Sequence, residues 1–233
     1  MVATTALALF SLYLVLWFIQ PLLSARESAR QDTELGVVPG PLPDTELAAL
    51  NPKPIVRFGT SFQVPWGQLE LERNGTSFNV MNFKNGPAIM FFNPATNPSR
   101  GMARANDPHE QARMRSMFGE KAVSSSYDWE QAILEATPDQ IQWWNRSNDR
   151  RLAVLLNLKA MDLNLAPVIY SLAGNDLRGF QIGDADVPSG QVRIKLYDAK
   201  GRIYEFLITN RPGDSPGAQK QINAFIASIR PAS

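Results

Sequence analysis

The chain has 233 residues, of which 44% are hydrophobic and 19% are charged, so it is long enough for one domain with a core, or at most two small ones. Lys and Arg together number 23 and Asp and Glu 22, a balance that argues against a dedicated nucleic-acid-binding protein, which usually carries a strong basic excess. With no cysteine and a single histidine, the composition excludes disulfides, cysteine nucleophiles, iron–sulfur clusters, thiolate zinc sites and all-histidine metal sites within one chain.

The N-terminus is a long uncharged segment. Residues Val2 to Ala25 contain no charged side chain and are rich in Leu, Val, Ile, Phe and Trp. As a helix this run would span about 36 Å at about 1.5 Å per residue, which suffices for a tilted membrane crossing. We therefore predict that residues 1–25 form an N-terminal transmembrane helix, a single-pass anchor. A cleaved signal peptide is the alternative, although no basic residue precedes the run and Leu23 stands where a small residue is preferred.

The orientation of this segment rests on few charges. Arg26 and Arg30 come directly after it, and the positive-inside rule applied to them would place the rest of the chain in the cytoplasm. Two charges are weak evidence, and short N-terminal anchors often export the domain attached to them. We expect an extracytoplasmic domain attached to the membrane, with the cytoplasmic orientation as the alternative.

A proline-rich linker is predicted over residues 26–53. Pro39, Pro41 and Pro43 stand at every second place, which excludes a helix and favours an extended spacer. The linker would hold a single domain, residues 54–233, away from the membrane. A disordered N-terminal arm is the alternative interpretation.

Short β-prone runs come after the linker. Asn74-Gly75 and Asn85-Gly86 are two-residue turn signals between runs that alternate apolar and polar residues. The domain is therefore expected to open with antiparallel strands. These strands are predicted at residues 55–58, 61–64, 68–72, 77–83 and 88–92.

The middle of the chain has the pattern of helices. Asp107-Pro108 and Thr137-Pro138 each combine a capping residue with a proline at the first helical position. The capping residues, with Asp128 or Ser126 as the expected cap of the second helix, and the apolar spacing predict four helices. They cover residues 108–118, 127–136, a stretch that begins at 138 and carries Trp143 and Trp144, and residues 149–161.

The C-terminal third returns to strands and ends in a helix. Strands are predicted at residues 168–172, 178–183, 191–197 and 202–209, the last two joined by a turn. Ile222, Phe225, Ile226 and Ile229 recur at the spacing of one helical face. The terminal helix, 217–229, is therefore expected to pack on the sheet.

This order of elements is similar to the Mog1/PsbP-like α/β/α sandwich. The similarity includes the segment RGFQIG, the hairpin VRIKLYDAKGRIYEFLITN and the terminal helix that ends in FIASIR, and it extends over Ile55 to Arg230. The resemblance implies a central antiparallel sheet with helices on both faces, as in bacterial membrane-anchored proteins, and binding or assembly roles without catalytic residues. The helical insert, residues 107–163, departs from the compact pattern.

Few residues offer catalytic chemistry. His109 lies in a first helical turn beside Asp107 and Glu110, where it would serve as a general base or a metal ligand, but such a histidine more often faces solvent. Asp184 and Asp186 match part of a calcium loop, and a turn is the better interpretation. The chain lacks the glycine-rich nucleotide loops and the G-x-S-x-G serine motif.

The aromatic and basic residues near the end of the insert are the candidate contact site. Trp143 and Trp144 are adjacent, so both cannot face one core equally. The functional hypothesis is that one of them contacts a ligand, a partner or a membrane surface. A wide helix–helix interface that holds both is the interpretation that the sequence favours.

Arg150 and Arg151 come shortly after these tryptophans. A binding or assembly module would present a shallow exposed patch over the insert and no deep pocket. A carrier of a small ligand or lipid would instead need an apolar pocket between the sheet and the insert, near Trp143, Trp144 and Phe180.

Together these patterns predict an α+β fold. It consists of a central antiparallel sheet with helices on its faces, a helical insert and an N-terminal transmembrane helix. The predicted function is a membrane-anchored, non-catalytic binding or assembly module that needs no metal, cofactor or nucleic acid. The alternatives are a carrier of a small ligand or lipid with an apolar pocket, and a hydrolase that uses His109.

Overall fold

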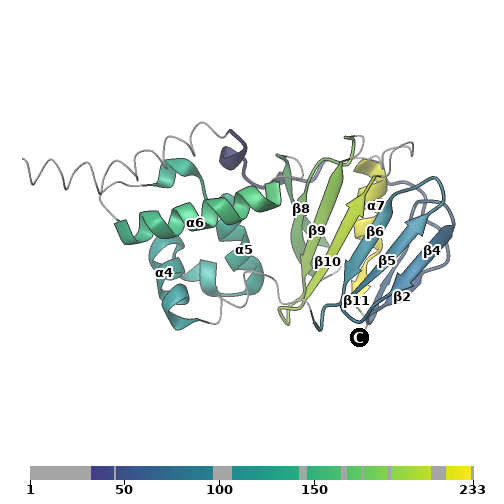
Figure 1. Cartoon of the computed structure of the whole chain (residues 1–233), viewed down its shortest axis with the longest axis horizontal. Helices are drawn as coiled ribbons and strands as arrows, with labels where there is room; N and C mark the ends of the chain where they lie inside the picture. The colour runs from purple at the N-terminus through teal and green to yellow at the C-terminus, as the bar shows by residue number, and fades with distance from the viewer. Residues whose placement is uncertain are drawn as a thin grey trace, which may run out of the picture.

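A mostly antiparallel sheet forms the centre of the molecule (Figure 1). The computed structural model describes residues 33–44, 46–96, 107–141, 146–163, 167–174, 176–187, 190–210 and 219–231. The sheet has eight strands in the order β1-β7-β8-β9-β10-β6-β5-β4. All neighbouring strands are antiparallel except β1 and β7, which are parallel. The strands are β1 (Gly40–Pro41), β4 (Leu69–Asn74), β5 (Phe78–Phe83), β6 (Ala88–Phe92), β7 (Ile169–Gly174), β8 (Leu177–Ile182), β9 (Gln191–Tyr197) and β10 (Ile203–Thr209).

Strands β4 to β6 precede the helical insert in the chain and strands β7 to β10 follow it, and the two groups meet where β6 pairs with β10. These strands pair although the helical insert separates them in sequence, with Phe206 opposite Phe91. The predicted α+β class and the central antiparallel sheet are therefore confirmed. Alternation along β9 gives the sheet two faces: Val192, Ile194 and Leu196 point to a first face, and residues 193, 195 and 197 point to a second.

Helix α7 (Gln219–Ser228) and a small three-stranded sheet pack against the first face. The small sheet has the order β11-β3-β2 and consists of β2 (Ile55–Arg57), β3 (Thr60–Phe62) and β11 (Arg230–Pro231). Phe206 stacks on Phe91 with ring centroids 4.3 Å apart, and Phe62 and Phe225 meet Phe206 edge-on. Aromatic rings thus fill much of the core on this face. The predicted apolar face of the last helix is confirmed, because its isoleucines and Phe225 pack in this core.

The helical insert is α4 (Pro108–Phe118), η2 (Glu120–Val123), α5 (Ser126–Glu135), η3 (Pro138–Gln140) and α6 (Arg146–Leu163). Asp107 caps α4 as predicted, and its side chain accepts a backbone N–H of the first turn. Helix α5 is capped in the same way by Ser125, and not by the predicted Ser126 or Asp128, which both lie within the helix. The described part of the helix expected after Thr137 is a single 3-10 turn, closed by a capping box between Thr137 and Gln140. Trp143 and Trp144 lie outside the described residues.

The insert lies beyond one end of the sheet and packs on its second face (Figure 1). Leu134 of α5 and Leu163 of α6 form a core cluster with Phe180 and Ile182 of β8 and with Tyr197. The larger core lies on the first face of the sheet, and no insert residue in the described ranges belongs to it. The insert and the sheet therefore share the second-face cluster and not the first-face core.

Residues 33–44 and 46–51, which we call the strap, wrap around the end of the sheet where β7 and β8 lie. The strap begins with η1 (Thr33–Gly36), in which Leu35 is buried. It continues through β1 beside β7, so the extended backbone expected at the alternating prolines is a short edge strand here. It then crosses α7, where the Pro43 carbonyl accepts a hydrogen bond from Asn223 Nδ2 at 3.0 Å. The stretch predicted as a spacer thus contacts the domain along much of its length.

Among the helices of the described residues, none is long and apolar enough to cross a membrane. The predicted anchor, residues 1–25, lies outside the described part of the chain. The anchor and its orientation therefore stay predictions.

Candidate functional site

A cavity of about 500 Å³ lies between the strap, α7 and the first face of the sheet. We call it the strap pocket. It is bounded by the strap on one side, by the β7–β8 hairpin and β9 below, and by α7 on the other side. Its lining residues are Leu42, Pro43, Asp44, Leu47, Leu172, Ala173, Gly174, Leu177, Leu196, Asn223, Ile226 and Ala227.

The strap pocket is apolar because each element contributes an apolar surface to it. The sheet provides buried leucines, including Leu172 and Leu196, and the strap provides Leu42 and Leu47. The space remains unfilled where the lining residues are small. A methyl group added at Gly174, for example, would have no atom within 4 Å. Small residues at the end of β7 and on α7 thus leave a volume that larger side chains would occupy.

A chain of buried amides holds the strap over this pocket. Gln181 and Gln219 exchange two hydrogen bonds, of 2.8 and 2.9 Å. Gln219 Nε2 also donates to Asn223 Oδ1 at 2.8 Å, and Asn223 Nδ2 donates to the carbonyl of Pro43. Because Asn223 uses both ends of its amide in this chain, it serves to fix the strap.

Among the lining residues that the structure describes, Asp44 is the one ionisable residue, and it is exposed. No hydrogen bond or ion pair of its side chain occurs within the described parts of the chain. The pocket thus combines an apolar interior with one carboxylate.

The strap pocket lies on the opposite face of the sheet from the predicted site. Phe180 is fully buried on the second face, where its ring stacks on Tyr127 with centroids 5.0 Å apart. It does not line the strap pocket. With Trp143 and Trp144 outside the described residues, the ligand contact proposed for these three aromatic residues stays a prediction.

The two arginines of the predicted site differ in their surroundings. Arg150 is exposed on α6, whereas Arg151 is only 8% exposed and forms an ion pair with Glu110 of α4. Arg151 therefore connects two helices of the insert. Phe180 packs in the core cluster between the insert and the second face. The ligand or partner contact predicted for Arg150, Arg151 and Phe180 stays a prediction.

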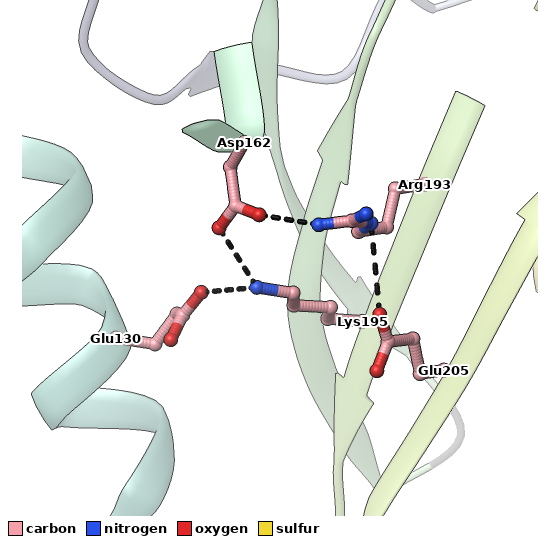
Figure 2. A network of polar contacts seen from close by, with 5 residues as sticks. All are labelled: Glu130, Asp162, Arg193, Lys195 and Glu205. Carbon is pink, nitrogen blue, oxygen red and sulfur yellow. Dashed lines mark hydrogen bonds and ion pairs between the residues drawn. The ribbon is translucent and has the colours of Figure 1, made fainter. Parts of the chain in front are cut away.

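A network of buried and half-buried charges joins the insert to the sheet (Figure 2). Lys195 of β9 reaches Glu130 of α5 at 2.6 Å and Asp162 of α6 at 3.0 Å. Arg193 of β9 pairs with Asp162, and its Nε lies 3.6 Å from Glu205 of β10. Burial alone would lower the pKa of Lys195, but the charges of Glu130 and Asp162 outweigh it and raise that pKa above its ordinary value. We call these five residues the charge network, and their mutual pairing is that of a structural bridge.

The other candidate polar residues have local roles. His109 is exposed at the start of α4, and its backbone N–H donates to Asp107 Oδ1 at 2.9 Å. Asp184 accepts the backbone N–H of Asp186, whose carboxylate in turn accepts the backbone N–H of Gln219 at the start of α7. Nowhere in the described ranges do three or more His, Asp or Glu side chains gather in a group that could hold a metal ion.

Comparison with protein-family models, with curated proteins and with solved structures found no match to this chain. The resemblance to the Mog1/PsbP-like sandwich therefore rests on the sequence pattern alone, and the chain is assigned to no family. The mixed α/β architecture with its large antiparallel sheet and helical insert rests on the structure itself.

Proposed function

We propose that this protein is a non-catalytic binding module that holds a small apolar ligand, or the apolar part of a larger one, in the strap pocket. The volume of that pocket, about 500 Å³, supports this proposal most directly. Small-molecule sites in proteins usually enclose about 300–1,000 Å³ and are lined mainly by apolar side chains with a few polar groups. The leucines of three separate elements and the single carboxylate fit that description.

The chemistry of the lining residues favours binding over catalysis. Those that the structure describes include no histidine, serine, threonine, lysine or tyrosine that would act as a base or nucleophile beside Asp44. Asn223 is occupied by Gln219 and by the strap. His109, the residue of the hydrolase hypothesis, is exposed on α4 and lines neither the strap pocket nor the two smaller cavities that the described residues of the insert form.

The proposed setting is a membrane surface. If residues 1–25 form the anchor, only residues 26–32 separate it from the strap. An extended chain spans at most about 3.6 Å per residue, so Thr33 would lie within about 30 Å of the end of the anchor. An apolar molecule that leaves the bilayer would then reach the strap pocket over a short distance. We propose the extracytoplasmic side for this domain.

The test is binding of N-phenyl-1-naphthylamine, a neutral apolar dye whose fluorescence rises in apolar surroundings. The variant Ala227→Phe places a phenyl ring at a lining position that is exposed, so folding should be preserved. We expect it to weaken dye binding about tenfold, which corresponds to about 1.4 kcal/mol. The control Ala199→Phe adds the same ring at an exposed position in the β9–β10 turn and should bind as the wild type does. Equal binding by both variants would rule out the strap pocket as the site.

An assembly role is the second candidate, and one observation favours it. Val154 and Met161 are 41% and 55% exposed and lie seven residues apart on α6, with half-buried Leu158 between them. This spacing puts an apolar stripe on one side of the helix, as in helices that bind other helices. Sedimentation velocity of the wild type and of Val154→Glu tests it: self-association that this variant abolishes would support assembly, and a wild-type monomer would count against a homo-oligomer.

A further inference from the structure

We infer that the ligand of the strap pocket is an amphiphile with a positively charged or hydrogen-donating polar end, such as an alkyl amine, and that Asp44 binds this end. The inference rests on the proposed function and specifies its ligand. It depends on the polar groups that the pocket offers and on those that it lacks.

The lining residues provide a counter-charge for a cation only. Apart from Asp44 and Asn223, the lining residues within the described ranges are leucine, isoleucine, alanine, glycine or proline, and none of these is basic. The Asn223 amide donates to the strap and accepts from Gln219, so it is already committed. A carboxylate or phosphate group on the ligand would therefore enter without a cationic partner, beside the carboxylate of Asp44.

Asp44 is suited to meet an ammonium group. Its side chain is exposed, and it has no hydrogen bond or ion pair within the described residues. A hydrogen bond between an ammonium and a carboxylate is stronger than one between neutral groups. Near a surface, two opposite charges about 4 Å apart attract enough to change an affinity by about tenfold or more.

The charged residues near the pocket are negative, as Asp44 is, with one exception. Glu46 and Asp176 each lie next in the chain to a lining residue, Leu47 and Leu177. Lys220 opposes them, because it lies three residues before Asn223 and seven before Ala227 on α7 and so shares their side of the helix. Lys220 is exposed and does not line the pocket, so we expect it to weaken the preference for a cation without reversing it.

Displacement of the naphthylamine dye from the full chain tests this inference. Three competitors share a twelve-carbon chain and differ only at the polar end: dodecylamine, dodecanol and dodecanoate, each kept below its aggregation concentration. We expect dodecylamine to displace the dye from the wild type at about tenfold lower concentration than dodecanoate. In Asp44→Asn this difference should fall below about twofold, while displacement by dodecanol stays unchanged. In the control Lys220→Gln the preference for the amine should persist or grow.

The outcomes separate the inference from the proposed function. If dodecanoate competes as well as dodecylamine in the wild type, or if Asp44→Asn keeps the full preference, Asp44 does not select the polar end and the inference is wrong. The strap pocket would still be a binding site in that case. If neither the dye nor any of the three competitors binds, the proposed function fails together with the inference. Thermal melting of both variants confirms that the exposed substitutions leave the fold intact.

Discussion

Lys159 is the least typical residue of the core, because this lysine is fully buried and pairs with no acidic side chain of the described residues. Its Nζ donates to the backbone carbonyls of Leu35, at 3.0 Å, and of Ala136, at 2.7 Å. Burial lowers the pKa of Lys159 to about 8. The residue therefore ties the start of the strap to the insert, and the protonated form of its amine is disfavoured in the folded state.

This pKa predicts that stability increases with pH. The unfolded lysine holds its proton up to a pKa of 10.5, whereas the folded one releases it near about 8, so the unfolded state binds more protons between these values. The free energy of unfolding should rise by about 2 kcal/mol between about pH 8 and about pH 10 relative to Lys159→Met. Urea denaturation across this range measures the difference.

A control separates this effect from general titration of lysines. Lys200 is exposed in the β9–β10 turn, so Lys200→Met should follow the wild-type profile. If the free energy of unfolding changed with pH in the same way for the wild type and for Lys159→Met, the buried amine would have its ordinary pKa and the prediction would be wrong.

At the scale of the element, the pairing of strand β8 with strand β9 depends on a single glycine. Gly179 lies opposite Leu196, and a Cβ at this position would overlap the carbonyl oxygen of Lys195 and lie 2.9 Å from the Leu196 Cα. Gly179→Ala should lower the free energy of unfolding by about 3 kcal/mol, because two central strands would have to separate. Gly174→Ala, in the adjacent strand β7, is the matched control, since its Cβ meets no atom within 4 Å. Urea midpoints that coincide for the two variants would contradict the prediction.

Elements with a local pattern were predictable from the sequence. The cap at Asp107, the alternation along β9 and the apolar face of α7 are all encoded by residues close to one another in the chain. The cap of α5 was predicted at Ser126 or Asp128 and lies at Ser125, because several neighbouring side chains there are able to cap. The pairing of β10 with β6 and of β1 with β7 was not predictable, because long-range partners leave no periodic pattern. The helix expected to carry Trp143 and Trp144 rested on the cap at Thr137, and that cap closes only a 3-10 turn in the described residues.

The sequence did not predict the strap pocket either, because its walls are also long-range partners. Its walls come from residues 42–47, from the β7–β9 strands and from α7, which are brought together only by the complete fold. Leu42 and Leu47 were the sequence signal that could have indicated the pocket. A solvated spacer has no need of large apolar side chains, so two leucines in a proline-rich stretch indicate contact with the domain. The pocket expected near Phe180 would instead lie on the second face of the sheet, because Phe180 packs there in the core cluster with the insert.

For the whole molecule, the charge network determines how the insert is held on the sheet. Three carboxylates, from α5, α6 and β10, meet two cations of β9 (Figure 2). Buried pairs such as Lys195 and Glu130 add little net stability over apolar residues, but removal of one partner leaves an uncompensated charge. The network thus favours one position of the insert over others.

Lys195→Met should therefore loosen the insert before it loosens the sheet. It leaves Glu130 without its cation and should lower the free energy of unfolding of the insert by about 3–5 kcal/mol. Because the first-face core contains no insert residue, backbone amides of α5 and α6 should lose protection from hydrogen exchange while those of β5 and β6 keep theirs. Combining Lys195→Met with Glu130→Gln removes the unpaired charge and should restore most of the protection. If the single variant instead loses protection equally in α5 and β5, the insert and the sheet open as one cooperative unit, and the charge network would be a support for the whole fold.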